Sequence, residues 1–363
     1  MNVYYITLIL VCMLCYYAEE SDWPEVDKFN ILRIIHTSDT RILYSLVAAV
    51  LIFVAGFRYR VGADYMAYYS GYTGFLNDLL NDIRNIDEPG YGVLVWIATR
   101  FYDDGAAGIF IASFVTISLP LYVIYSHSDN LLLPTLLYII MGCWDGSFNG
   151  VRQYLAAAVL FCGYEALKEK NLSKYCIIVL IAFLFHRSAI VFVILYFIVN
   201  REINAPNIIF LFVAAGIMLF SYDRAFQLAN LVMDQEYSLE IAYTSRAVNR
   251  LRVLATFVPV FVFGNEYYHQ KRTQSITFAL NIIIFKATLS VLTMNSALLY
   301  RINIYTSFFA PLAINELLKG ISERNKKIIT GGLVTMYLVM WLYEIYISRS
   351  MNNFQWIWNR PKV

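Results

Sequence analysis

Charged residues are scarce in this chain of 363 residues: Asp, Glu, Lys and Arg together make up 15%, against 59% hydrophobic residues. Mean hydropathy is +0.56. Soluble domains contain about 25% charged residues, so this composition excludes an ordinary soluble protein and predicts a polytopic membrane protein. The net charge of +2 says nothing about nucleic acid, because in a membrane chain the distribution of Lys and Arg among the loops is what matters, and we expect no nucleic-acid partner.

The sequence also lacks the patterns of several enzyme classes. It contains no Walker motif, no Gly-rich dinucleotide loop, no Gly-Xaa-Ser-Xaa-Gly elbow and no His/Glu metal pattern. We therefore expect a site that works without nucleotide, metal or cofactor. The cysteines lie in or beside apolar segments without paired spacing, which is typical of packing residues: Cys12, Cys15, Cys143, Cys162 and Cys176.

Apolar segments run through the whole chain. Because about 20 residues cross a bilayer, they predict roughly eleven to thirteen spanning or half-spanning helices in an all-α protein. The segments are residues 1–17, 42–57, 92–101, 107–125, 131–143, 151–167, 175–200, 207–222, 251–264, 276–292, 296–317 and 328–347.

The organisation is that of a single integral membrane domain over residues 1–363. There are no internal repeats, no low-complexity tract and no linker long enough to separate domains. Residues 1–17 lack a basic leader and a small-residue cleavage site, so we expect a retained helix there and not a signal peptide. Two long loops are predicted, near residues 58–91 and 223–250.

Basic loops predict the orientation. Lys168, Lys170 and Lys174 share one short connection, and a second basic connection covers residues 319–327. Both are expected to face the cytoplasm. Residues 19–41, with Lys28, Arg33 and Arg41, are a third basic segment, and if this segment is inside, the loop 58–91 is outside. The number of crossings then requires that segment 92–101 or segment 131–143 fails to span. It also favours two half-helices that meet at His186 within residues 175–200, although one long helix is the alternative.

The densest polar cluster lies at residues 57–68, directly after an apolar segment. Arg58 and Arg60 stand there beside Asp64. Charge at the edge of the hydrocarbon is costly without a partner, so the cluster indicates a site for an anionic substrate. The alternative is a pair of arginines that anchor the helix at the interface.

Two further motifs place polar side chains at helix starts. Arg152 and Gln153 begin a good apolar helix, where unpaired N–H groups favour an anion, although an arginine that only anchors the helix is the alternative. Glu88 precedes Pro89-Gly90 and offers a carboxylate that we expect near Asp64; a simple turn is the alternative.

Two polar residues interrupt apolar segments. His186 is followed by Arg187 and Ser188, so it is either a hydrogen-bonded structural residue or part of a site. Arg301 lies in segment 296–317 with Tyr305 one turn further on the same face, and such an arginine must find an anion or a cavity.

Together these motifs resemble the EpsG-like branch of the Wzy polysaccharide polymerases. They follow the order of that family and cover most of the chain, and Gly62-Ala63-Asp64 fits its Gly-Xaa-Asp pattern. The motifs are residues 57–65 with Tyr68, 88–91, 151–156, 185–189, and Tyr300-Arg301 with Tyr305.

The resemblance implies a GT-C-like membrane glycosyltransferase architecture without a large soluble domain. It implies a multi-pass protein of the bacterial cytoplasmic membrane with an active site on the extracytoplasmic face. There an inverting, metal-independent transfer would join oligosaccharide repeat units carried on undecaprenyl pyrophosphate. Membrane lipid, a chain-length regulator and a flippase of the same pathway are the implied partners. An O-antigen ligase and a lipid-linked glycan flippase are the alternatives.

Within this interpretation, a pyrophosphate leaving group needs charge stabilisation and the acceptor hydroxyl needs a base. We expect Asp64 or His186 to accept the proton and Glu88 to hold a sugar or orient an arginine. Tyr65, Gln153 and Tyr305 are further substrate-binding candidates. The expected phosphate clamp consists of Arg58, Arg60, Arg152 and Arg301, with Arg152 also assigned a catalytic role.

Overall fold

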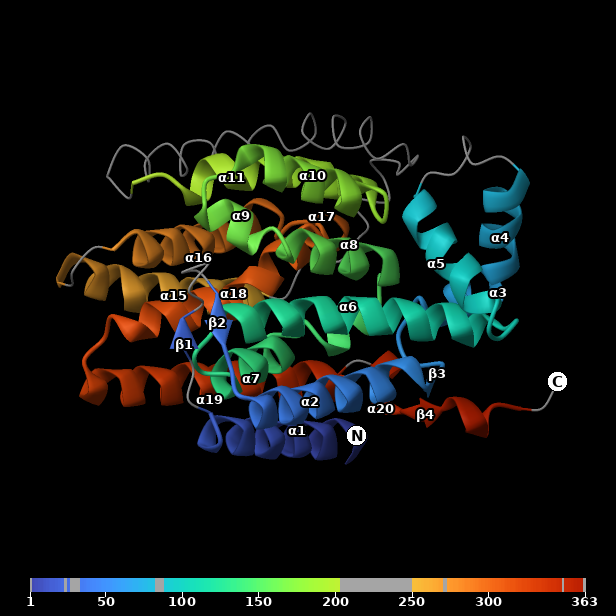
Figure 1. The fold of residues 1–363 in the computed structure, drawn as a ribbon, viewed down its shortest axis with the longest axis horizontal. Helices are drawn as coiled ribbons and strands as arrows, with labels where there is room; N and C mark the ends of the chain where they lie inside the picture. Colours follow the sequence, from blue (N-terminus) through green and yellow to red (C-terminus); the bar gives the residue numbers. More distant parts are fainter. Residues whose placement is uncertain are drawn as a thin grey trace.

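The computed structural model describes residues 2–22, 25–26, 33–81, 88–202, 250–269, 273–347 and 349–361. Helices dominate this part of the chain (Figure 1). Six apolar stretches within it are long enough to cross a membrane, the fifth of which runs through two consecutive helices. They are α1 (Asn2–Glu20), α2 (Ser38–Gly56), α6 (Gly105–His127), α16 (Gln274–Leu292), α17 (Ala297–Tyr300) with α18 (Asn303–Lys319), and α19 (Glu323–Ile347). The protein is therefore an all-α polytopic membrane protein, as the composition predicted.

Shorter elements fill the spaces between the long helices. The helices are α3 (Tyr65–Ser70), α4 (Tyr72–Asn81), α5 (Pro89–Thr99), α7 (Leu132–Ile140), α8 (Val151–Phe161), α9 (Tyr164–Lys168), α10 (Leu172–Phe183), α11 (Val193–Val199), α15 (Arg250–His269) and α20 (Arg349–Asn352). The 3-10 turns are Asp145–Phe148, Arg187–Phe192 and Ile357–Asn359. Two antiparallel strand pairs join β1 (Glu25–Val26) to β2 (Ile34–Ile35) and β3 (Arg58–Tyr59) to β4 (Gln355–Trp356).

The long helices lie side by side along the long axis of the molecule, and α3, α4 and α5 gather at one end (Figure 1). Helix α2 packs on α1 and α6, α8 contacts α6, α10 and α18, and α16 packs between α15 and α18. The core between them is strongly aromatic, and its largest fully buried side chains include Trp144, Phe148, Phe161 and Tyr305. Pairing of β3 with β4 brings the C-terminal segment back to the end of α2.

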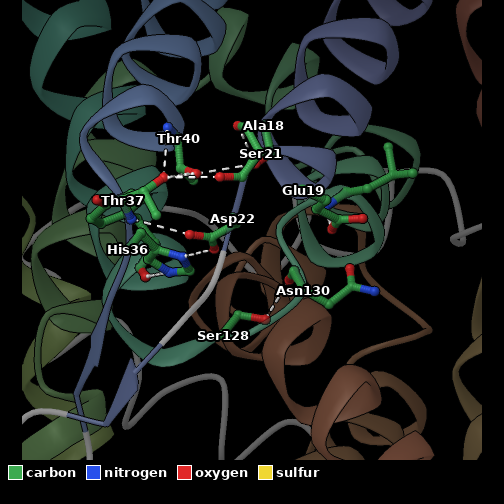
Figure 2. Close-up of polar contacts among 11 residues, drawn as sticks. Ala18, Glu19, Ser21, Asp22, His36, Thr37, Thr40, Ser128 and Asn130 are labelled. Carbon is green, nitrogen blue, oxygen red and sulfur yellow. Dashed lines mark hydrogen bonds and ion pairs between the residues drawn. The ribbon is translucent and has the colours of Figure 1, made fainter.

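A buried polar network closes the connection between α1 and α2 (Figure 2). The Thr37 N–H donates to Asp22 Oδ1 (3.1 Å), and the other carboxylate oxygen contacts His36 Nδ1. The Thr40 hydroxyl donates to the carbonyl oxygen of Ala18 (3.1 Å). These contacts satisfy backbone groups that the end of α1 and the start of α2 leave unpaired, and they hold the two helices side by side.

The predicted short segments are short in the structure. Residues 92–99 belong to α5, which has 11 residues, and residues 131–143 contain α7, which has 9. At a rise of about 1.5 Å per residue, both are well below a hydrocarbon core of about 30 Å. Length therefore does not distinguish the two segments, since both helices are shorter than a full span. Segment 151–167 divides into α8 and α9. The expected segment 207–222 and nearly all of the loop 223–250 lie outside the described residues.

Candidate active site

Two of the predicted motifs meet at the N-terminus of α8. The Gly150 N–H donates to Asp64 Oδ2 (2.9 Å), and the Ala63 N–H donates to Asn149 Oδ1 (2.5 Å). Gly62 has a φ of +102°, and a Cβ there would lie 2.2 Å from a carbonyl oxygen of the facing loop. Only glycine fits this close approach. The loop after α2 is therefore held against the start of α8, and Asp64 is fixed at that point.

Arg301 brings a third motif to the same place. Its Nη2 lies 4.0 Å from Asp64 Oδ2, and its side chain is 51% exposed. The Gln153 side chain donates from Nε2 to the carbonyl oxygen of Arg301 (3.2 Å), which fixes the junction between α17 and α18 against α8. Gln153 thus positions the backbone of Arg301. The exposed guanidinium keeps donors available to an anionic ligand.

Glu88 joins two other motifs. One carboxylate oxygen, Oε1, contacts His186 Nδ1 and accepts from the Arg187 N–H (3.3 Å). The other, Oε2, lies 2.5 Å from Arg152 Nη1. This contact places Glu88 beside one of the arginines that it was expected to orient. Within the described residues, its ion-pair contacts are with Arg152 and His186.

The electrostatics of Glu88 follow from this position. Its side chain is 7% exposed, and burial by itself would raise its pKa. The hydrogen bond with His186 and the charges of His186 and Arg152 oppose that effect, and the resulting pKa lies below the ordinary value for Glu. Glu88 is therefore a carboxylate at neutral pH. It orients an imidazole and a guanidinium at once.

The predicted helix break at His186 is present. Helix α10 ends at Phe183, His186 has an extended backbone (φ −159°, ψ 123°), and a 3-10 turn from Arg187 to Phe192 leads into α11. The Gly90 N–H donates to the carbonyl oxygen of Leu184 (2.8 Å), so the loop before α5 docks on the break. Irregular backbone at membrane depth requires such partners. The break presents His186 to Glu88 with a side chain that is 19% exposed.

Arg152 lies in the first turn of α8, between Glu88 and an aromatic pair. Its Nε donates to the Tyr68 hydroxyl (3.4 Å), and its guanidinium carbon is 5.9 Å from the Tyr68 ring centre and 5.8 Å from that of Phe75. The side chain is partly exposed. The contacts with Glu88 and with the two aromatic rings fix the orientation of the guanidinium. A guanidinium with a fixed orientation can bind an anion in a defined geometry.

The other two predicted clamp arginines take different positions. Arg58 is 1% exposed beneath the cluster and donates to the Ser113 hydroxyl (3.0 Å) and to the carbonyl oxygen of Val61 (3.3 Å). We therefore assign Arg58 a supporting role in place of the expected contact with phosphate. Its guanidinium also lies over the rings of Tyr65 and Phe148, and these contacts are not visible in the spacing of the sequence. Arg60 is exposed and has a φ of +53°, and its guanidinium carbon lies 5.4 Å from the centre of the Tyr59 ring. Among the described residues, the ion pairs of Glu88 and Asp64 do not include Arg60.

The two tyrosines predicted to contact substrate are buried instead. Tyr65 is stacked on Tyr69, with ring centres 5.8 Å apart. The Tyr305 hydroxyl is 2.9 Å from the Ser188 hydroxyl, which ties α18 to the segment after His186. Both predictions are corrected to packing roles. Large aromatic rings gain free energy from burial. Sequence spacing alone does not show whether a tyrosine near a polar site is buried.

A cavity of about 390 Å³ adjoins the cluster and shares Asn149, Gly150 and Arg301 with it. The other charged residues of this cavity were not predicted from the sequence. One signal was present, because Lys286 is the only charged residue in the predicted segment 276–292. The charged residues that line the cavity apart from Arg301 are Asp145, Arg252, Lys286 and Glu344. Within the described ranges, no group of three or more His, Cys, Asp or Glu side chains could hold a metal ion.

Comparison with known proteins gives one family. No curated protein and no solved structure matches the chain. Residues 41–357 match the EpsG family, which is a span that contains every site residue described above. The chain therefore belongs to the EpsG family.

Proposed function

We propose that this protein is a polysaccharide polymerase that joins oligosaccharide repeat units carried on undecaprenyl pyrophosphate. The reaction would take place on the extracytoplasmic face of the bacterial cytoplasmic membrane. Membership of the EpsG family supports a polysaccharide polymerase of the membrane. The observation that carries the proposal is the convergence of Arg152, Arg301 and His186 around the carboxylates of Glu88 and Asp64.

The chemistry is an inverting glycosyl transfer. The acceptor hydroxyl oxygen attacks the anomeric carbon of the donor chain on one face, and the bond to pyrophosphate breaks on the other. Arg152 and Arg301 stabilise the charge that develops on the departing pyrophosphate. The acceptor proton passes to His186. Because the leaving group is already activated, this mechanism uses no metal ion.

The structure offers a reason to choose His186 over Asp64 as the base. Asp64 Oδ2 accepts from the Gly150 N–H and faces Arg301, so this oxygen already has donors within the protein. His186 Nδ1 contacts the Glu88 carboxylate. This contact favours the tautomer with the proton on Nδ1 and leaves the lone pair of Nε2 available to the acceptor hydroxyl.

An O-antigen ligase would use the same chemistry with a different acceptor, and a lipid-linked glycan flippase would need an arginine-lined path. A flippase is less favoured because Arg152 and Arg301 lie at one junction around the start of α8. Deletion in the native host separates the three, with gel analysis of the glycan as the readout. A polymerase predicts loss of the long-chain ladder with one repeat unit still attached. Loss of every attached repeat would contradict the proposal and favour a ligase or a flippase.

A further inference from the structure

The cavity beside the cluster contains a buried cation for which the described residues provide no carboxylate partner. Lys286 lines it from α16 and is 8% exposed. In the part of the chain that the structure describes, the ammonium group makes one polar contact, with the Ser307 hydroxyl (2.6 Å). An ammonium group has three donors and carries a full charge, so one neutral partner leaves it incompletely compensated at this depth.

The carboxylates of the cavity are committed elsewhere. Glu344 forms a two-point ion pair with Arg252, in which Arg252 Nε lies 2.7 Å from Glu344 Oε1. Asp145 Oδ1 accepts from the indole N–H of Trp341 (2.9 Å). Within the described residues, neither carboxylate lies within ion-pair distance of Lys286. A ligand that brings its own anionic group would supply the missing charge.

The remaining walls suit a sugar ring. Trp341, Tyr337 and Tyr300 line the cavity, and aromatic faces pack well against the apolar face of a pyranose. The Arg252–Glu344 pair adds donors and acceptors for hydroxyl groups. A volume of about 390 Å³ falls in the range of about 300–1,000 Å³ that is usual for small-molecule sites.

We propose that this cavity is the subsite for an acceptor sugar that carries a carboxylate, and that Lys286 selects for that acidic group. The proposal rests on the proposed function and names the substrate class of the same site. Arg301 and Gly150 border both the cavity and the cluster, so a sugar bound there lies next to the part of the cluster around Asp64 and Arg301. Lysine acts as a point charge, which suits one carboxylate, whereas the planar forks of Arg152 and Arg301 suit pyrophosphate.

The test is a binding measurement on the purified full-length protein in detergent, by isothermal titration calorimetry. The probes are methyl β-D-glucuronide, methyl β-D-glucoside and inorganic pyrophosphate. We expect the glucuronide to bind about 10- to 100-fold more tightly than the glucoside, as one charge-assisted contact provides. Lys286→Met should remove that preference, and Lys286→Arg should keep most of it. Lys326→Met, which removes a partly exposed lysine at the start of α19, is the matched control and should bind like the wild type.

Three results would overturn the proposal: equal affinities of the wild type for the two glycosides, no saturable glucuronide binding, or pyrophosphate binding that Lys286→Met weakens. The last would assign Lys286 to the leaving group. If Lys286→Met does not fold, the proposal is still tested by the preference of the wild type for the glucuronide and by whether Lys286→Arg keeps that preference. The measurement requires no turnover, so a negative result leaves the polymerase assignment and its deletion test untouched.

Discussion

Glu88 and His186 are 98 residues apart in the sequence, and their side chains are in direct hydrogen-bonding contact. The same carboxylate also contacts Arg152. One buried acid therefore couples the proposed base to a proposed phosphate ligand. The position of either group depends on the loop that carries Glu88, which docks on the break after α10 through Gly90.

The first prediction concerns the pyrophosphate ligands. Arg152→Lys and Arg301→Lys keep the charge but lose the planar fork, so each should lower the polymerisation rate by about 2–4 kcal/mol in the activation free energy, or roughly 30- to 900-fold. The measurement is the rate of glycan elongation at equal protein level. Arg41→Lys, at an exposed position in α2, is the control and should be normal. Near-normal rates in both site variants would disprove the clamp.

The second prediction concerns the base. His186→Ala should lower the rate about 10²- to 10⁴-fold, which is the usual contribution of general base catalysis. Glu88→Gln keeps the shape of the side chain but removes the carboxylate charge that holds Arg152 and His186 in place, so it should also lower the rate. The measurement is the elongation rate between pH 5 and pH 9. If Asp64→Asn abolishes turnover while His186→Ala is active, the proton acceptor is Asp64.

A third prediction separates support from contact with substrate. Arg58→Ala should destabilise the protein by about 3–5 kcal/mol, because it empties a buried volume and leaves the Ser113 hydroxyl and a carbonyl group without their donor. Arg60→Ala, two residues further on and exposed, should change stability by less than about 0.5 kcal/mol. Thermal unfolding in detergent measures both. A stable but inactive Arg58→Ala protein would return Arg58 to the clamp.

The fourth prediction concerns the orientation in the membrane. In a background without the five native cysteines, Ala63→Cys places a thiol at an exposed position beside Asp64. It should react with a membrane-impermeant maleimide in intact spheroplasts. Lys170→Cys, in the basic connection before α10, should react only after permeabilisation. Labelling of Lys170→Cys from outside would invert the topology and place the site in the cytoplasm.

Much of the fold could be predicted from the sequence because apolar length and interrupting polar groups have direct physical consequences. The break at His186 is an example. A His-Arg-Ser sequence inside an apolar segment requires partners that a continuous helix facing lipid does not supply. The meeting of Asp64 with Arg301 also follows from the expectation that an intramembrane arginine finds an anion.

The exact division of roles could not be predicted. Arg58 and Arg152 are the same residue type in similar surroundings, and Arg58 is buried through contacts with distant residues, among them Ser113 and Phe148. Lys286 stood out as a charge in an apolar segment, but its significance depends on which carboxylates surround it. That depends on helices α15 and α19, whose packing no local pattern specifies.

The most direct test of the account is incubation of the purified protein with undecaprenyl-pyrophosphate-linked repeat units in the presence of a chelator. The products should lengthen by whole repeats, and one undecaprenyl pyrophosphate should be released per new linkage. Failure of the folded, detergent-solubilised protein to lengthen the glycan would contradict the assignment as a polymerase. Activity that the chelator abolishes and a divalent ion restores would contradict its metal-independent mechanism.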